Sequence, residues 1–298
     1  MKVLVTGGAG FVGSRTTIEL RRRGHDVLAI GRSLAPPDWM ASYQVIYTAI
    51  DLMDREDILR FLRVHVPDGI IHLAWYTEPQ SYLTDMYGNL TSLAASLNLL
   101  AAAAAVEIPH VVLGGTCLED ADVTTEPIYA RLKRTLHRVA EESFASTDVR
   151  VTCAHIFSAY GPGEHPDRAI PSIIRAVTAG HPISMRDERS LREYVHVDDV
   201  ASALATIMET GEGGRFDICT GSSQPLGEVF SLLAQILGDE SLVRFDAVSP
   251  PQAEFDVRGN PGPLRRLGWS PGHTLETGLR STVEWWRSTE GTQDVREE

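Results

Sequence analysis

Thr6-Gly7-Gly8-Ala9-Gly10-Phe11-Val12-Gly13 is the stretch that decides the fold of this chain. It lies between an apolar run typical of a β-strand, at residues 3–5, and a helical pattern over residues 11–23. Its glycines have the spacing G-x-x-G-x-x-G. Glycine permits a tight turn and a close backbone approach, and the free N–H groups of a helix N-terminus attract a phosphate. A strand, this loop and a helix in that order predict a binding site for the pyrophosphate of a dinucleotide.

Short apolar runs alternate with helix-length patterns through the first half of the chain. The runs typical of strands cover residues 3–5, 27–30, 45–47, 70–73, 111–113 and 151–156. Helical patterns lie between them at residues 11–23, 55–64, 90–105 and 129–144. This alternation predicts right-handed βαβ units and therefore a doubly wound parallel sheet, the Rossmann type of α/β fold.

The pattern changes after residue 165, where a loop rich in Gly and Pro is followed by helical patterns at 170–178, 226–237 and 275–286. We therefore expect a dinucleotide-binding domain at residues 1–165, to which the chain returns near 194–220. A smaller α/β region at 166–288 is expected to bind mainly the substrate. The polar residues 289–298 are expected to form a flexible tail.

The charge, the apolar runs and the cysteines of the chain exclude several classes of function. Acidic residues outnumber basic ones by 40 to 27, and the formal net charge of -13 argues against binding to nucleic acid. Because the chain begins directly with a strand pattern and has no run of 18 apolar residues, we expect a cytoplasmic protein with no membrane partner. The three cysteines have neither CxxC spacing nor a neighbouring His cluster, so the sequence predicts no disulfide and no metal site.

The residues after the second and third predicted strands bear on the choice of cofactor. A site for NAD usually has an acid at the end of the second strand, whereas this chain has Ile30-Gly31-Arg32-Ser33. A guanidinium can pair with a 2′-phosphate, so Arg32 favours NADP(H), with NAD(H) as the alternative if Arg32 is only a solvated surface residue. Asp51 and Leu52 are predicted to border the adenine, unless Asp51 only caps the next helix.

Several motifs, in order and over nearly the whole chain, carry a resemblance to a known family. They are the glycine loop, His72-Leu73-Ala74, Tyr129-x-x-x-Lys133, and the stretches at residues 156–163, 192–200 and 267–271. With them the sequence resembles the extended short-chain dehydrogenase/reductases, the NAD(P)-dependent sugar epimerase/dehydratase family. The resemblance implies an oxidoreductase or epimerase with a nicotinamide cofactor, a nucleotide-diphosphosugar substrate, and a homodimer formed through two helices.

Tyr129 and Lys133 are the predicted acid/base pair. Four residues apart on a helix, they lie on one face, one turn from each other. An ammonium and the positive nicotinamide ring would both favour phenolate, which brings Tyr129 into range for proton transfer near neutral pH. Only two residues of the chain are Lys, Lys2 and Lys133, although it has 27 basic residues. This scarcity makes a chance Tyr-x-x-x-Lys improbable.

The third catalytic residue of the family is a Ser or Thr after the fifth strand, and Thr116 is the available hydroxyl there. It would hydrogen-bond the reacting sugar oxygen. A second register resembles the 3,5-epimerase/4-reductases that make fucose, and it would place Gly115 at the hydroxyl position and Cys117 at the acid/base position. We prefer Thr116, because Gly115 leaves that second triad incomplete. Cys117 is then either a candidate acid/base or a small buried residue.

The resemblance also implies the remaining contacts. The expected cofactor-binding residues are Gly7, Gly10, Phe11, Val12, Gly13, Arg32, Asp51, Leu52, Leu73, Ala74, Tyr129 and Lys133. The expected substrate-binding residues are Trp75, Ser158, Arg168 and Arg192, although Ser158 replaces an Asn that the family often carries. His72 is expected to be structural, and Asp198 and Asp199 to begin a helix.

Three reactions share this scaffold: 4,6-dehydration, epimerisation and keto reduction. Related dehydratases carry Asp-Glu directly after the catalytic Thr, where this chain has Cys117-Leu118. The sequence therefore favours NADPH-dependent reduction of a nucleotide-diphospho-4-keto-6-deoxysugar, a 4-ketoreductase of deoxysugar biosynthesis. The alternatives are a C4 epimerase and a 3,5-epimerase/4-reductase that uses Cys117. A non-catalytic NADP sensor is remote, because it would not need Tyr129 and Lys133 together.

Overall fold

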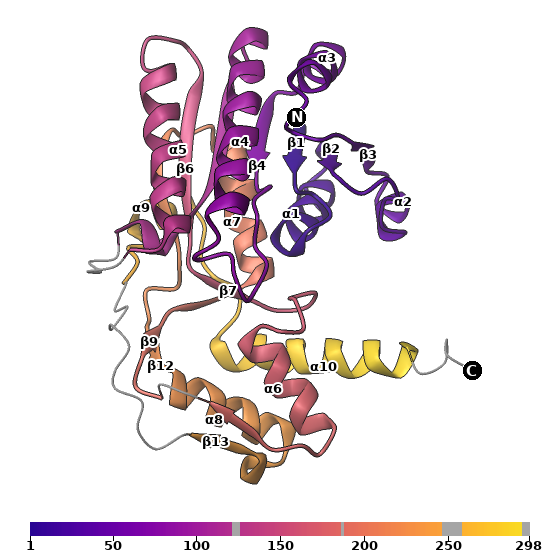
Figure 1. The fold of residues 1–298 in the computed structure, drawn as a ribbon, viewed down its shortest axis with the longest axis vertical. Coiled ribbons are helices and arrows are strands. Elements are labelled where there is room, and N and C mark those ends of the chain that lie inside the picture. Colours follow the sequence, from indigo (N-terminus) through magenta and orange to yellow (C-terminus); the bar gives the residue numbers. More distant parts are fainter. Residues whose placement is uncertain (121–125, 186–187, 246–257, 294–298) are drawn as a thin grey trace.

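The computed structural model describes residues 1–120, 126–185, 188–245 and 258–293. These residues include a seven-stranded parallel sheet, the upper part of Figure 1. In spatial order its strands are β11 (Gly214–Ile218), β6 (Arg150–Ile156), β5 (His110–Thr116), β4 (Gly69–His72), β1 (Lys2–Thr6), β2 (Asp26–Gly31) and β3 (Ile46–Ala49). The order reverses between β1 and β4, the point at which such sheets bind ligands. The predicted Rossmann fold is confirmed.

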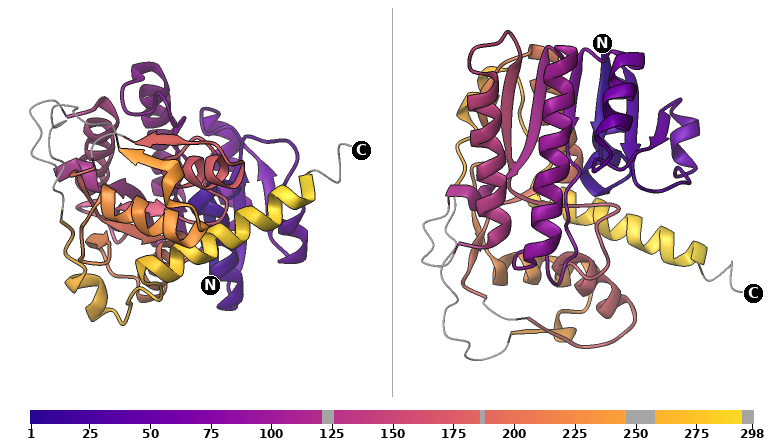
Figure 2. Two further views of the ribbon diagram at one scale, coloured as in Figure 1. Left: turned by 90° about the horizontal axis from the view of Figure 1, so that it is seen from below. Right: turned by 45° about the horizontal axis from the view of Figure 1, so that its top comes forward.

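Alternating side chains of each strand face two different helical layers. In β1, Val3 and Val5 join the core that contains α1 (Phe11–Arg22) and α7 (Val197–Thr210). Leu4 faces the core beneath α3 (Arg55–His65), α4 (Met86–Val106) and α5 (Ile128–Phe144). Figure 2 shows α4 and α5 side by side over this second face. The sheet is therefore covered on both sides, as its continuous apolar strands require.

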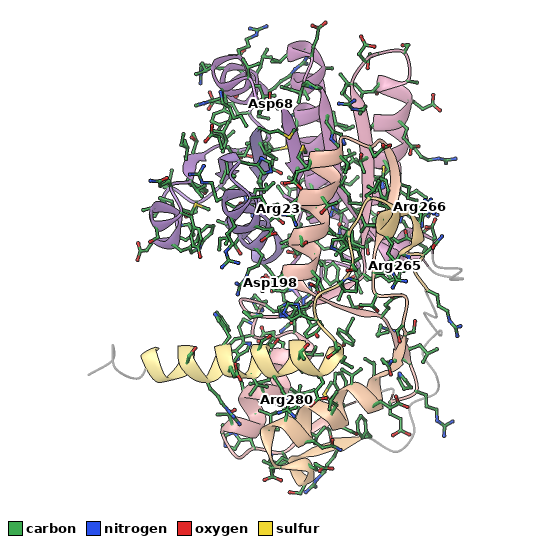
Figure 3. All side chains as sticks on the ribbon, turned by 180° about the vertical axis from the view of Figure 1, so that it is seen from behind. Arg23, Asp68, Asp198, Arg265, Arg266 and Arg280 are labelled. Carbon is green, nitrogen blue, oxygen red and sulfur yellow. The ribbon has the colours of Figure 1, made fainter. Side chains whose placement is uncertain are left out.

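Hydrogen bonds also join the two helices on the first face. Arg23, at the end of α1, donates to Ser202 Oγ and to Glu209 Oε2 of α7, each over 2.8 Å. Figure 3 shows Arg23 at this contact, and Asp198 near the start of α7, where that helix approaches the lower part of the molecule. Asp198 and Asp199 lie in the first turn of α7, as the sequence predicts.

Helix α4 is, among the described residues, long and apolar enough to cross a membrane by length and composition alone. Its second half packs into the core of the sheet through Leu99, Leu100 and Ala103. Its first turns leave Met86, Tyr87 and Leu90 exposed. The packing of Leu99 and its neighbours marks α4 as a core helix of the sheet layer.

A smaller lobe lies below the sheet in Figure 1. Its core is formed by α6 (Ala169–Thr178), α8 (Leu226–Leu237) and α10 (Leu275–Gln293). The short strand pairs are β8 (Ile183–Met185) with β13 (Val243–Phe245), β9 (Leu191–Arg192) with β12 (Gln224–Pro225), and β7 (Ser158–Tyr160) with β10 (Tyr194–His196). The short elements α2 (Trp39–Ser42), η1 (Cys117–Asp120), η2 (Glu240–Leu242) and α9 (Gly262–Arg266) complete the described structure.

Two differences from the predicted elements matter below. Strand β5 continues past residue 113 to Thr116, because Gly114, Gly115 and Thr116 pair with β6. Helix α10 continues to Gln293, so residues 289–293, predicted to begin the flexible tail, are helical. The rest of that tail, residues 294–298, lies outside the described residues.

Candidate active site

A cavity of about 850 Å³ is lined by the carboxyl ends of the sheet strands and by residues of the smaller lobe. Its wall brings together the glycine loop, the three predicted catalytic residues and the four predicted substrate-binding residues. Of the predicted site residues, only Asp51 and Leu52 do not line it. Residues as far apart in sequence as 7 and 194 thus meet at the switch point of the sheet.

The glycine loop has the geometry that a dinucleotide requires. Gly7 has φ of +67°, a conformation that favours glycine, and a Cβ on Gly13 would collide with the Gly7 carbonyl oxygen. Helix α1 begins after Gly10 with no side-chain cap, so its first N–H groups are available to a ligand. The loop therefore fits a bound pyrophosphate, and Phe11 and Val12 line the cavity beside it.

The adenosine end of the cavity differs from the prediction. Arg32, at the end of β2, lines the cavity as expected, together with Ser33 and Tyr47. Tyr47 donates a 2.9 Å hydrogen bond to the Ser33 carbonyl. The exposed Asp51 instead accepts a hydrogen bond from the Met53 backbone. Leu52 also lies away from this wall, because its side chain is buried in the core beneath α3 and α4.

Lys133 is a buried residue of the cavity wall. Its ammonium donates a 2.6 Å hydrogen bond to the Gly114 carbonyl and lies 4.2 Å from the centroid of the Trp75 ring. Burial lowers the pKa of Lys133 to about 8, although the charge of Glu119 opposes this effect. Trp75, predicted to bind substrate, thus also supports Lys133 through a cation–π contact. Its indole N–H donates to Asn89.

Tyr129 packs edge-on against Tyr82, with 5.0 Å between the ring centroids. Burial raises the pKa of Tyr129 above its ordinary value, Tyr82 and Glu119 raise it further, and Arg168 opposes them. The groups of the chain itself therefore do not lower the pKa of Tyr129, and they favour the phenol over the predicted phenolate. The reason is that burial outweighs the nearby positive charge. Tyr129 is held as a phenol, the form that donates a proton.

The segment at the end of β5 packs tightly against the buried side chains behind it. A Cβ on Gly115 would lie 2.5 Å from His137 Cε1 and 2.7 Å from Glu119 Oε1, so a serine cannot replace it without displacing these side chains. Thr116, the last residue of β5, lines the cavity. Burial raises the pKa of Cys117 to about 12, although a hydrogen bond from Thr116 opposes it. The thiol is protonated at neutral pH and is a weak base.

The predicted substrate residues Arg168, Arg192 and Ser158 line the same cavity. The Arg168 guanidinium lies 4.5 Å from the Tyr82 ring centroid and donates to the Thr77 carbonyl. Arg192 donates to Ser190 Oγ over 2.6 Å and to the Leu191 carbonyl over 2.8 Å. Both guanidinium groups line the cavity, where planar donors suit a diphosphate. Ser158 belongs to β7.

Glu164 is a cavity residue that the sequence reasoning missed. Its Oε2 atom is buried and has no hydrogen-bond partner among the described residues. Burial raises the pKa of Glu164 to about 8, with Arg168 opposing. The only signal in the sequence was its place in the loop after Gly161-Pro162-Gly163, next to residues that carry the family resemblance.

His72, expected to be structural, is buried at the end of β4. Its ring nitrogens lie 2.7 Å from Thr6 Oγ1 and 2.8 Å from Ser96 Oγ. Burial lowers the pKa of His72 to about 3, so the imidazole is neutral. The ring therefore connects β1, β4 and α4 beneath the cavity.

Known proteins share this architecture. The NAD dependent epimerase/dehydratase family matches residues 3–219. A dTDP-glucose 4,6-dehydratase of Mycobacterium tuberculosis is 28% identical, over 97% of this chain and 94% of its own length. A UDP-glucuronic acid decarboxylase of Xenopus tropicalis is 24% identical, over 96% of this chain and 72% of its own. The structure of a Thermus thermophilus UDP-glucose 4-epimerase in complex with NAD is 25% identical with a TM-score of 0.84, covering 96% of this chain and 99% of that one.

The matched residues contain the glycine loop, Thr116, Tyr129 and Lys133. The enzymes above are similar to this chain over nearly its whole length. The chain therefore belongs to the NAD dependent epimerase/dehydratase family and is a nicotinamide-dependent enzyme of the extended short-chain dehydrogenase type.

Proposed function

We propose that this enzyme reduces the 4-keto group of a nucleotide-diphospho-4-keto-6-deoxysugar and that NADPH is the reductant. The observation that carries the proposal is the set of groups around Thr116. Tyr129 is a phenol and Thr116 a hydroxyl, so both can give a hydrogen bond or a proton to a sugar oxygen. The next residues, Cys117 and Leu118, offer no effective base for a carbon-bound proton.

Two arginines of the cavity favour a substrate that carries a nucleotide-diphosphate group. Arg168 and Arg192 line the cavity and can pair with phosphate oxygens. The related proteins carry the names of enzymes that act on dTDP- and UDP-linked sugars. A nucleotide-diphosphosugar is therefore the proposed substrate class. The nicotinamide ring of NADPH would supply the hydride.

The preference for NADP(H) rests on Arg32. It lies at the end of β2, lines the cavity and occupies the place where an acid would hold a ribose 2′-hydroxyl. The Thermus epimerase structure contains NAD, so NAD(H) is the competing choice of cofactor.

A C4 epimerase is the second candidate, because the Thermus UDP-glucose 4-epimerase shares the fold over nearly its whole chain. An epimerase at C4 needs the same proton donor and the same cofactor, and differs in retaining the cofactor through each turnover. The 3,5-epimerase/4-reductase reaction is less favoured, because burial raises the pKa of Cys117 to about 12.

We also propose that two copies of the chain associate through α4 and α5 and that the protein acts in the cytoplasm. Met86, Tyr87 and Leu90 of α4 and Val139 of α5 are exposed apolar side chains on neighbouring helices. Sedimentation equilibrium tests this arrangement: Tyr87→Glu is expected to yield monomers from a dimeric wild-type protein.

Turnover in D2O tests the reaction. Purified enzyme is mixed with NADPH and dTDP-4-keto-6-deoxyglucose, and the sugar is analysed by mass spectrometry and NMR. We expect one NADPH consumed for each sugar reduced and no solvent deuterium on ring carbons, because Tyr129 and Thr116 deliver protons only to oxygen. In a parallel reaction with UDP-glucose in place of the keto-sugar, isomerisation of the sugar without net oxidation of NADPH would favour the C4 epimerase. Deuterium at C3 or C5 would overturn the proposal, and its loss in Cys117→Ser or in Glu164→Gln would identify the base.

A further inference from the structure

Three ionisable side chains lie buried directly behind the cavity wall. Glu119 of η1 is 1% exposed, His137 of α5 is 5% exposed and His155 of β6 is 4% exposed. None of the three lines the cavity. Burying such groups is unfavourable unless they are paired and hydrogen-bonded, so their contacts need an explanation.

Glu119 connects the three elements that carry the cluster. Its Oε2 atom lies 2.8 Å from His137 Nδ1 and 3.5 Å from His155 Nε2, and the two imidazole rings stack with 5.5 Å between centroids. Its Oε1 atom accepts a 2.8 Å hydrogen bond from the Thr116 backbone N–H. One carboxylate thus holds the end of β5 against α5, the helix that also carries Tyr129 and Lys133.

The backbone leaves room for this arrangement. A Cβ at Gly115 would meet all three members of the cluster: 2.5 Å from His137 Cε1, 2.7 Å from Glu119 Oε1 and 2.9 Å from His155 Cδ2. The residue before Thr116 therefore has no side chain where the cluster packs against β5.

The charge of Glu119 reaches both members of the acid/base pair. Burial lowers the pKa of Lys133, and Glu119 is the group that opposes this shift. Burial raises the pKa of Tyr129, and Glu119 adds to that increase. Burial also raises the pKa of Glu119 itself, but His137, His155 and the Thr116 N–H outweigh it and hold that pKa below its usual range. Glu119 is therefore ionised at neutral pH.

We propose that Glu119, fixed by His137 and His155, is a positioning residue that holds Thr116 through its backbone and keeps the Lys133 ammonium protonated. The inference rests on the proposed function only in taking Thr116 and Lys133 as catalytic groups. Without Glu119, no carboxylate would oppose the effect of burial on the pKa of Lys133. The ammonium would then lose its proton at a lower pH than in the wild-type protein.

Other charged and titratable groups face the same region. His72 on β4 and Tyr129 on α5 are close enough to interact with Lys133. Asp120 of η1 and Asp217 of β11 approach His155 Nδ1, and Arg215 of β11 pairs with both aspartates. Glu119 and Lys133 bind the same end of β5, through the Thr116 N–H and the Gly114 carbonyl, and Glu119 is the carboxylate whose charge acts on Lys133.

A metal ion is the competing explanation, since the ligand atoms of the cluster lie within 4.8 Å of one another. The contacts favour hydrogen bonding instead. The 2.8 Å separation of Glu119 Oε2 and His137 Nδ1 is that of a charge-assisted hydrogen bond, and Oε1 is already bonded to the Thr116 N–H.

The scarcity of lysine allows a direct test that needs no substrate. In protein labelled with ε-13C-lysine, NMR signals arise from only two side chains, Lys2 and Lys133, and Lys2→Arg assigns them. Titration of the wild-type protein is expected to give Lys133 a pKa of about 8. In Glu119→Gln, which retains an oxygen that can accept from Thr116, the pKa of Lys133 is expected to fall. In Glu119→Asp, which retains the charge, it is expected to remain closer to the wild-type value.

Asp199→Asn is the matched control, because Asp199 is also a buried carboxylate but lies at the start of α7. It should leave the Lys133 titration unchanged. An unchanged Lys133 titration in Glu119→Gln, an equal fall in Asp199→Asn, or stoichiometric zinc in the purified protein would each overturn the proposal. Should Glu119→Gln fail to fold, the uncharged Glu119→Met takes its place. Failure of the proposed reaction would appear separately, as a wild-type enzyme that does not reduce the keto-sugar.

Discussion

Lys133 donates its 2.6 Å hydrogen bond to the backbone carbonyl of Gly114, two residues before Thr116. This bond ties α5 to the carboxyl end of β5, so the elements that carry Tyr129 and Thr116 are fixed relative to each other. The Trp75 ring lies 4.2 Å from the ammonium, measured to the ring centroid. The lysine therefore has a structural task in addition to its effect on proton transfer, and both follow from its burial.

Removing the phenol is expected to stop the reaction without removing the cofactor. In Tyr129→Phe the ring still packs against Tyr82, but no proton can be delivered to the sugar oxygen. We expect turnover to fall by about 100-fold or more, the usual cost of losing a general acid. Steady-state kinetics measure the fall, and fluorescence titration with NADPH should show nearly unchanged affinity. Wild-type turnover in this variant would remove Tyr129 from the mechanism.

Arg32 is expected to determine the choice of dinucleotide. The native protein should bind NADPH more tightly than NADH, because a charge-assisted contact to the 2′-phosphate contributes about 1.5–3 kcal/mol. Arg32→Ala should lose most of this difference while NADH affinity changes little. Isothermal titration calorimetry with both cofactors measures it, and Arg131→Ala on α5 serves as a control for lost surface charge. Equal affinities in the native protein would refute the role of Arg32.

Gly115 is expected to tolerate no side chain. In Gly115→Ala the new methyl group would lie 2.5 Å from His137, and overpacking of this kind destabilises a protein by about 1–3 kcal/mol. Urea unfolding measures the loss. The control is Gly213→Ala, whose Cβ would make only an ordinary 3.4 Å contact with the Val151 carbonyl. Equal stabilities of the two variants would show that the buried cluster adjusts freely.

Glu164 is expected to make stability depend on pH. Burial raises the pKa of Glu164 from 4.5 to about 8, so the folded protein binds this proton more tightly than the unfolded chain. Its contribution to stability is then present at low pH and is lost as the pH rises through this interval. Glu164→Gln should remove that part of the dependence, so its Tm relative to wild type should increase between pH 5 and pH 8.

Thermal unfolding followed by circular dichroism at both pH values provides the measurement. Glu142→Gln, an exposed position on α5, is the control and should follow the wild-type protein. A constant difference in Tm between Glu164→Gln and wild type would contradict a titrating Glu164.

The local pattern of the chain was enough to predict the sheet and the cofactor loop. Gly7 and Gly13 satisfy constraints that act within one strand, one turn and one helix, so their spacing carries the information. Tyr129 and Lys133 are also encoded locally, because a separation of four residues places them on one helical face. The alternation of strands and helices predicts a parallel, doubly wound sheet, since parallel crossovers have one hand.

Tertiary packing decided what no local pattern contains. The directions in which the pKa values of Tyr129 and Lys133 shift arise from burial beneath residues distant in sequence, and burial of Tyr129 favours the phenol in the chain itself. Leu52 lies in the core rather than on the cavity wall, because its apolar side chain packs beneath α3 and α4. Glu164 shares the cavity wall with residues of the sheet and of the smaller lobe that are distant from it in sequence.

The sequence by itself determined which elements form and which residues can do chemistry, because helix and strand periodicity and backbone freedom at glycine are short-range properties. Only the tertiary structure decided how those residues ionise and how the segment at 115–117 packs. Both depend on desolvation and on contacts between β5, α5 and β6. Such contacts join Glu119 to His137 and His155 across 18 and 36 residues of sequence, and no pattern within either interval specifies them.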